Sequence, residues 1–277
     1  MNGGQASNLQ QRVISGVVLI VVALALTWAG GVWYRLLAAA ISGAVLYEWL
    51  TMTARSEKPS NRWLAIGLLA VLLILLVTGA SISFLSMALV GAIVVTGAHA
   101  ARFEAGVWPT LGLAYAGLLG IALSALRGSD AAGLAATLFL FAVVWATDIL
   151  AYFVGRAVGG PKLAPAISPG KTWSGAVGGT VAAVLAGIFV AGQLGSPLGW
   201  GALLALTLVL SVVSQGGDLF ESWIKRRFGV KDSSQLIPGH GGVMDRVDGL
   251  ATAAFALFLL GAAIAGPNTP ADAFFGR

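Results

Sequence analysis

Cysteine is absent from this chain of 277 residues, and charged residues are scarce, at 10%. The lack of cysteine excludes disulfides, thiolate metal sites and cysteine nucleophiles. A soluble domain usually carries about 25% charged residues, whereas this chain is 58% hydrophobic and has a mean hydropathy of +0.90. The composition therefore excludes an ordinary soluble domain and predicts an integral membrane protein.

Long apolar stretches separated by polar breaks predict an all-α, polytopic fold with about nine transmembrane helices, because roughly 20 apolar residues span a bilayer. MNGGQASNLQQR runs straight into the first stretch without a small-x-small cleavage site, so we expect a retained span and not a signal peptide. We expect residues 1–277 to form a single membrane domain, with N-terminal helices at 1–130 and C-terminal catalytic helices at 131–277. The expected spans are 13–30, 32–53, 63–79, 82–98, 110–126, 131–154, 175–193, 199–217 and 249–266.

The distribution of Lys and Arg predicts how these spans are oriented. With nine spans, 13 of the 16 basic residues lie on the side shared by the N-terminus and the even-numbered loops, and cytoplasmic loops are enriched in such residues. We therefore expect a cytoplasmic N-terminus, two long cytoplasmic loops (155–174 and 218–248) and a prokaryotic inner (plasma) membrane location. The net charge of +5 then reflects orientation and anionic lipid, so we expect no nucleic-acid partner.

Acidic residues number only 11, and several fall within or at the ends of the expected spans. An ionised carboxylate inside a bilayer costs a few kcal/mol, so it normally faces the bundle interior, an ion or a partner charge. With no Cys or His cluster present, carboxylate oxygens suit Mg²⁺ before Zn²⁺. For Glu48 we favour an internal hydrogen bond or a helix-end position. The candidate metal ligands at the expected cytoplasmic edge are Asp148, Asp218, Asp245 and Asp248.

Helical spacing groups some of these residues. If the eighth span continues through GDLFESWIKRRF, then Asp218, Ser222 and Lys225 share one face. Asp245 and Asp248 are three residues apart and can point the same way at the start of the last helix. Aspartates beside several cations are what a metal-bound polyphosphate requires. The alternative for the basic cluster at 225–227 is a snorkelling, topology-setting role.

Two glycine-containing segments are candidate phosphate sites. PGHGG at 238–242 predicts a tight turn before a helix, which either presents N–H groups to an anion or simply re-enters the membrane. GKT at 170–172 resembles the end of a Walker A loop, but Pro165 stands where the first glycine is needed, so we exclude a P-loop. Basic and hydroxyl residues in that loop suit either phosphate or a lipid headgroup collar; those retained as candidates are Arg156, Ser168, Lys171 and Thr172.

The stretch SWIKRRFGVKDSSQLIPGHGGVMDRVD, residues 222–248, resembles the signature of the phosphatidate cytidylyltransferase (CDP-diacylglycerol synthase) family. DILAYFVGR at 148–156 and ISPGKT at 167–172 are similar to the same family. The resemblance covers about the C-terminal half of the chain at the level of motifs. Ser174 departs from the family pattern, which has an acidic residue there, so the resemblance supports no carboxylate role at this position.

The resemblance implies Mg²⁺-dependent transfer of a cytidylyl group from CTP to phosphatidic acid, giving CDP-diacylglycerol and pyrophosphate within the lipid membrane, and leaves a second metal ion open. The lipid phosphate is itself the nucleophile, so catalysis reduces to holding two polyanions in line and neutralising developing charge. The implied catalytic residues are Asp218, Lys225, Arg226, Asp245, Arg246 and Asp248. The implied substrate-binding residues are Arg156, Ser168, Lys171, Thr172, Ser222, Lys231, Asp232, Gly239, His240, Gly241 and Gly242.

Other functions compete with this interpretation. An ion-coupled transporter would place its charges near the membrane midplane, often in repeated halves, and no repeat is visible. A CTP-dependent lipid kinase shares the need for Mg²⁺ and a cytoplasmic nucleotide, so only the product separates it. A purely structural membrane protein would bury these charges without compensation. Small-residue surfaces such as GAVGG at 175–179 pack helices either within one subunit or between two, which leaves a homo-oligomer open.

Overall fold

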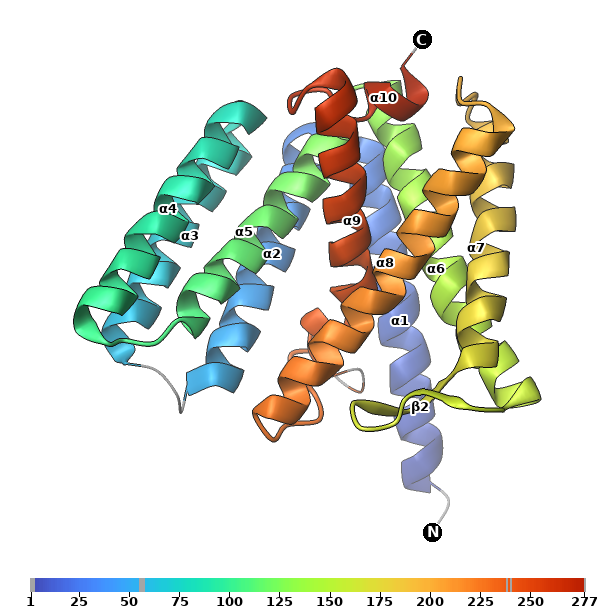
Figure 1. The fold of residues 1–277 in the computed structure, drawn as a ribbon, viewed down its shortest axis with the longest axis horizontal. Coiled ribbons are helices and arrows are strands. Elements are labelled where there is room, and N and C mark those ends of the chain that lie inside the picture. The colour runs from blue at the N-terminus through green and yellow to red at the C-terminus, as the bar shows by residue number, and fades with distance from the viewer. Residues whose placement is uncertain (1–2, 55–57, 238, 240, 277) are drawn as a thin grey trace. The chain divides into compact units, whose positions relative to one another are not determined.

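The computed structural model describes residues 3–54, 58–237, 239 and 241–276, with side chains from residue 14 onward. It is almost entirely helical (Figure 1), which confirms the expected all-α, polytopic fold. In this described part, eight helices are long and apolar enough to cross a membrane, and a shorter apolar stretch, Ile14–Ala29, precedes them. The helices are α1 (Gly3–Ala29), α2 (Gly31–Thr53), α3 (Pro59–Thr78), α4 (Ile82–Phe103), α5 (Trp108–Arg127), α6 (Ala131–Val158), α7 (Trp173–Gln193), α8 (Trp200–Arg227), α9 (Met244–Ala265) and α10 (Asp272–Phe275).

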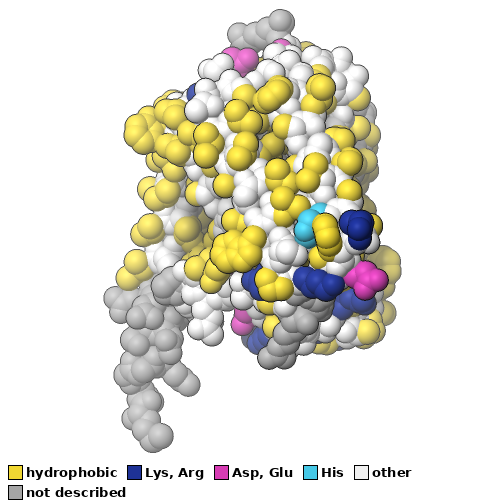
Figure 2. Space-filling view, turned by 90° about the vertical axis from the view of Figure 1, so that its left-hand side faces the viewer, with side chains coloured by type: hydrophobic (Ala, Val, Ile, Leu, Met, Phe, Trp, Pro, Cys, Tyr) yellow, Lys and Arg dark blue, Asp and Glu magenta, His cyan; other side chains and the backbone are white. Residues whose placement is uncertain are grey.

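Local sequence signals set several helix boundaries. Pro59 opens α3, and Gly79 ends it in the left-handed conformation with φ of 89°. Asp130 caps α6 by accepting a hydrogen bond of 2.8 Å from the Gly133 amide. One face of the surface is mostly hydrophobic along its height, with Lys and Arg side chains gathered towards one end (Figure 2), as a membrane-embedded bundle requires.

Several helices extend beyond the apolar stretches that predicted them, and three of these extensions shorten the two expected long loops. α6 continues to Val158 and α8 to Arg227, while α9 begins at Met244. The expected loop 218–248 therefore shortens to 228–243, because its charged ends are helical. Within the other expected loop, β1 (Lys162–Ala164) pairs antiparallel with β2 (Ser168–Thr172), a hairpin that the sequence did not predict.

The chain divides into two compact units. The N-terminal unit comprises Met1–Ser124 and Phe228–Arg246, and the C-terminal unit comprises Ala125–Arg227 and Val247–Arg277. Residues 228–246 thus group with the N-terminal helices. The expected single membrane domain, with its division at 130, stays a prediction.

Small residues bring α6 and α7 together in the C-terminal unit. The buried residues of α7 recur at every fourth position as Gly175, Gly179, Ala183, Gly187 and Ala191. A Cβ atom added at Gly179 would lie 2.6 Å from the carbonyl oxygen of Thr147, and one at Gly175 would lie 2.6 Å from that of Ala151. Small residues let helix backbones approach this closely, so the GAVGG surface packs within one chain.

A substitution pair tests this packing. We expect Gly179→Ala to destabilise the protein by about 1–3 kcal/mol, because the new methyl group would meet backbone that cannot move aside cheaply. Gly192→Ala is the matched control: it lies on the same helix, and no atom is within 4 Å of its added Cβ. Thermal unfolding in detergent should show a lower midpoint for Gly179→Ala alone. Equal midpoints for the two variants would contradict the close α6–α7 contact.

Candidate active site

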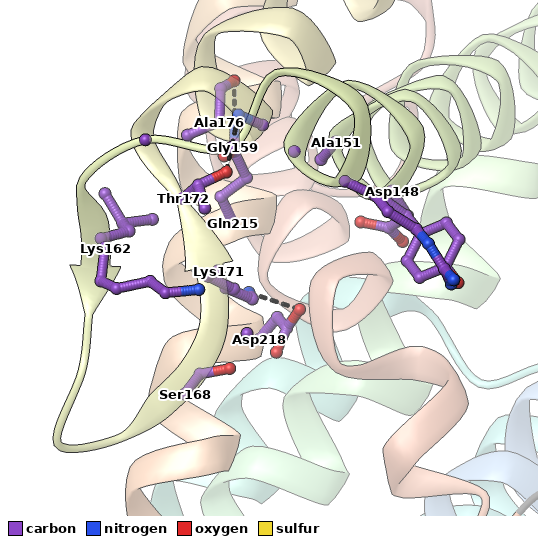
Figure 3. A pocket seen from close by; sticks show the side chains of 17 residues that line it. Asp148, Ala151, Gly159, Lys162, Ser168, Lys171, Thr172, Ala176, Gln215 and Asp218 are labelled. Atoms are coloured by element: carbon purple, nitrogen blue, oxygen red, sulfur yellow. Dashed lines mark hydrogen bonds and ion pairs between the residues drawn. The ribbon is translucent and has the colours of Figure 1, made fainter.

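A pocket of about 540 Å³ opens in the C-terminal unit, with its lining drawn from α6, the β1–β2 hairpin, α7 and α8 (Figure 3). This volume is typical of small-molecule sites. The pocket brings together two motifs that were separate in the sequence, DILAYFVGR on α6 and ISPGKT on β2. Six predicted site residues line it: Asp148, Arg156, Ser168, Lys171, Thr172 and Asp218.

An ion pair joins the two sides of the pocket. Lys171 on β2 places its Nζ atom 2.5 Å from Oδ2 of Asp218 on α8, and both side chains are partly exposed, at 25% and 32%. Ser222 Oγ donates to Oδ1 of Asp218 at 3.4 Å. This bond confirms that α8 continues helically through the charged segment and that Asp218 and Ser222 share one face.

Three aspartates of the C-terminal unit form an electrostatic cluster around Lys171. Asp148 interacts with the charges of Asp218 and Lys171. Asp248 interacts with Asp218, Asp148 and Lys171. Lys171 thus interacts electrostatically with all three carboxylates and forms an ion pair with Asp218.

The same three aspartates lie at matching heights along their helices. Asp148 and Asp218 follow the first residues of α6 and α8 by 17 and 18 positions, and Asp248 precedes the last residue of α9 by 17. At 1.5 Å per residue, each carboxylate lies roughly 26 Å from the far end of its helix. Since a bilayer core is about 30 Å thick, all three fall near one edge of the apolar layer, as the sequence predicted.

The cluster fits a divalent cation in ligand type and charge, because hard cations prefer carboxylate oxygens. Lys171 takes one Asp218 oxygen, and among the described residues no three acidic or histidine side chains are arranged to hold an ion. The metal assignment of Asp148, Asp218 and Asp248 therefore stays a prediction, supported by the ligand type and by the electrostatic interactions among the three carboxylates.

The pocket also contains polar residues that the sequence did not single out as site residues. Tyr152 accepts a 2.9 Å hydrogen bond from Nη1 of Arg156 at the pocket wall. Lys162 enters from β1, where it pairs in register with Thr172. Gln215 lies three residues before Asp218, and its Nε2 donates to Thr180 Oγ1 at 3.0 Å. Helical spacing from Asp218 could have identified Gln215, and Lys162 was already identifiable as one of the basic residues of the loop 155–174.

Thr172 and Ser174 organise the turn between the hairpin and α7. Thr172 caps α7 by accepting a 3.1 Å hydrogen bond from the Gly175 amide, so its hydroxyl has a structural task as well as a place at the pocket. Ser174, where the sequence departs from the family pattern, donates to the carbonyl oxygen of Gly159. Its role in this structure is to fasten the end of α6 to the start of α7.

The cations predicted at the end of α8 contact protein groups. Lys225 Nζ lies 3.1 Å from Oε1 of Glu221, whose side chain is fully buried. Arg226 Nε donates to the carbonyl oxygen of Ile167 at 3.3 Å, which ties α8 to the hairpin. These contacts give both residues a role in shaping the C-terminal unit, and their predicted phosphate contacts remain untested.

The remaining predicted residues belong to the N-terminal unit, except His240, which lies outside the described residues. Asp245 Oδ2 accepts hydrogen bonds from Ser233 N and Oγ, both at 3.0 Å, and from Gly242 N at 2.8 Å. The Gly242 amide that we expected to face phosphate therefore serves the loop itself, and Asp245 acts as its organiser. The other predicted residues in this unit are Lys231, Asp232, Gly239, Gly241 and Arg246.

Glu48 contacts the same loop. Its carboxylate accepts hydrogen bonds from Ser233, Ser234, Val243 and Met244, which confirms the expected internal hydrogen bonding. The sequence did not indicate these partners, because they lie at least 185 residues further along the chain.

Comparisons with known proteins agree with the sequence motifs. The model of the cytidylyltransferase family matches residues 10–264. A phosphatidate cytidylyltransferase of Brucella suis biovar 1 (strain 1330) is 50% identical over 273 residues, which cover 97% of this chain and 99% of that protein. Those of Haemophilus influenzae and Bacillus subtilis (strain 168) are each 36% identical, over 88% and 91% of this chain and 96% and 98% of their own lengths. The chain therefore belongs to the cytidylyltransferase family.

Proposed function

We propose that this protein catalyses Mg²⁺-dependent transfer of the cytidylyl group from CTP to phosphatidic acid, forming CDP-diacylglycerol and pyrophosphate for phospholipid synthesis. The names of the three relatives support this acceptor. The structural observation that carries the proposal is the pocket, which two carboxylates, Asp148 and Asp218, and three cations line, and with which Asp248 interacts electrostatically. This is the arrangement that a metal-bound polyphosphate and a lipid phosphate require together.

In the proposed reaction, an oxygen of the lipid phosphate forms a bond to the α-phosphorus of CTP. The bond between that phosphorus and the oxygen leading to the β-phosphate breaks, and its electron pair leaves with pyrophosphate. No protein nucleophile is needed, because the acceptor supplies the attacking oxygen. The protein's contribution is alignment and charge neutralisation, which together account for most of the acceleration in phosphoryl-type transfers.

The charged residues that line the pocket, together with Asp248, divide these tasks by charge. Asp148, Asp218 and Asp248 would hold Mg²⁺, which supplies charge neutralisation to the phosphate oxygens when bound. Arg156, Lys162 and Lys171 contribute positive charge from three elements around the same pocket. Lys171 would exchange its ion pair with Asp218 for a phosphate oxygen when the polyanion enters, which would leave the Asp218 carboxylate to the metal ion.

The pocket opens to the cytoplasm of a bacterial plasma membrane in this proposal. The bias of 13 basic residues among 16 towards one side supports this orientation. The diacyl acceptor then stays in the bilayer while CTP arrives from water.

The decisive assay supplies purified protein with labelled CTP and phosphatidic acid, with Mg²⁺ or with EDTA. We expect label in CDP-diacylglycerol with Mg²⁺ and a decrease of roughly 100-fold or more in EDTA, restored by added Mg²⁺. A CTP-dependent lipid kinase would instead release CDP and phosphorylate a lipid alcohol. A transporter would transfer no label to lipid, and either result would overturn the proposal.

A further inference from the structure

Glu48 is a buried carboxylate of the N-terminal unit that lies outside the pocket and accepts four hydrogen bonds. It lies on α2, and its exposure is 0%. Oε1 accepts from Ser234 Oγ at 2.6 Å and from Val243 N at 2.8 Å. Oε2 accepts from Met244 N at 2.7 Å and from Ser233 Oγ at 3.0 Å. Four donors from one loop thus converge on a single buried carboxylate of the N-terminal unit.

The position of this carboxylate explains how the loop 228–243 enters α9. Val243 and Met244 are the residues at which the helix begins, and their amides have no carbonyl partner inside the helix. Glu48 satisfies both amides and places a negative charge at the positive end of the helix dipole. In the part of the chain that the structure describes, we find no ion pair to Glu48, so hydrogen bonds and the helix end are what stabilise its charge.

Gly242 shows how closely the carboxylate packs against the loop. A Cβ atom at this position would lie 2.7 Å from both Glu48 oxygens and would also meet Ser233 Oγ. The second glycine of the GG pair is therefore required by Glu48, since any side chain would displace the carboxylate. Ser233 extends the same network, because its hydroxyl lies 3.0 Å from Asp245 Oδ2 as well as from Glu48.

We propose that Glu48 is a positioning residue for the cytidylyl transfer, acting by clamping the loop 228–243 and the first turn of α9. Asp248 follows Met244 by four residues in the same helix, about one helical turn after the amide that Glu48 holds. The clamp also constrains Lys231, Asp232 and Arg246, which flank its four donors in sequence. The effect on catalysis rests on the proposed function. The clamp on the loop rests only on the hydrogen bonds of Glu48.

The test compares conservative variants. Glu48→Gln keeps the volume, but the NH₂ group that replaces one carboxylate oxygen cannot accept from an N–H, so either Val243 or Met244 loses its partner. Glu48→Asp keeps the charge on a shorter side chain. Ser234→Ala removes one donor to Glu48, together with the hydroxyl that accepts a 3.1 Å hydrogen bond from the Leu236 amide, at a partly exposed position, and should fold normally. Ser42→Ala is the matched control, because it removes a buried 2.6 Å hydrogen bond from the same helix α2 without touching the loop.

Two readouts are needed, namely amide hydrogen exchange of peptides covering 231–246 and kcat of the full-length protein. We expect Glu48→Gln to speed exchange in these peptides by roughly 10-fold or more per lost hydrogen bond, with unchanged exchange in α3 to α5. We expect kcat to fall by about 10-fold or more, because small displacements of charged groups are costly to alignment. Glu48→Asp should recover part of both properties, Ser234→Ala should show a smaller change in each, and Ser42→Ala should change neither.

Wild-type exchange in these peptides of Glu48→Gln would overturn the clamp, as would faster exchange with unchanged kcat. If Glu48→Gln does not fold, Ser234→Ala becomes the test. Wild-type exchange and wild-type kcat in Ser234→Ala would then reject the proposal. If the wild-type protein makes no CDP-diacylglycerol, the proposed reaction fails while the exchange experiment still tests the clamp.

Discussion

Replacing Asp218 with asparagine should lower kcat by roughly 100- to 1000-fold while the protein stays folded. Asp218 is the residue through which the two sides of the pocket meet, since it pairs with Lys171 and accepts from Ser222. Asparagine retains the shape and one acceptor oxygen but loses the negative charge. The proposed divalent site then loses one of its three charged ligands, and Lys171 loses the partner that orients it.

The fold should survive this substitution because the Asp218 side chain is 32% exposed. Lys171 also keeps its interactions with Asp148 and Asp248. Asp272→Asn is the control: it removes the same charge from an exposed position in the short helix α10. Steady-state synthesis of CDP-diacylglycerol and a detergent melting curve should be measured on both variants. Activity above half of wild type in Asp218→Asn would refute its role in the reaction.

Lys171→Met carries the second large expected effect, a decrease of about 100-fold in kcat/KM for CTP. The substitution removes the cation that faces three carboxylates, so a bound polyanion would meet net repulsion unless Mg²⁺ is saturating. Lys171→Arg should recover part of the activity, because it restores the charge with a different geometry. Titration with CTP at several Mg²⁺ concentrations measures the effect.

The double variant Lys171→Met with Asp218→Asn separates direct from paired contributions. If the two residues act through their ion pair, the combined loss in kcat/KM should be smaller than the product of the single losses. A fully multiplicative loss would show that each residue acts independently. Lys58→Met, in the N-terminal unit, is the control for a lost lysine, since its ammonium contacts the carbonyl oxygen of Phe103.

Apolar length and the cost of buried charge made much of this structure predictable. The nine expected spans correspond to α1 to α9, because few other structures satisfy the backbone of so apolar a chain. Asp148 and Asp218 were identifiable because an ionised carboxylate in apolar surroundings is costly unless an ion or a partner charge stabilises it. The hairpin escaped prediction because its strands have three and five residues, too few for a periodic pattern.

Hydrogen-bond partners were the part that the sequence could not predict. Asp245 and Asp248 have the spacing of a carboxylate pair, but Asp245 turns to Ser233 and Gly242, whose donors need an acceptor. Glu48 meets its four donors only after the chain has folded back from α9 to α2. Neutral donors such as serine hydroxyls and glycine amides are abundant, so composition does not show which of them will face a carboxylate.

The shared height of Asp148, Asp218 and Asp248 ties the site to the thickness of the surrounding bilayer. Each carboxylate lies roughly 26 Å from the opposite end of its helix, whereas the hydrocarbon layer measures about 30 Å and varies with lipid composition. Longer acyl chains would thicken the hydrocarbon layer and place the carboxylates deeper within it, whereas shorter chains would place them in the headgroup layer. If the proposed reaction supplies the lipids of this membrane, the acyl chains of those lipids also set the depth at which the three carboxylates of the protein lie.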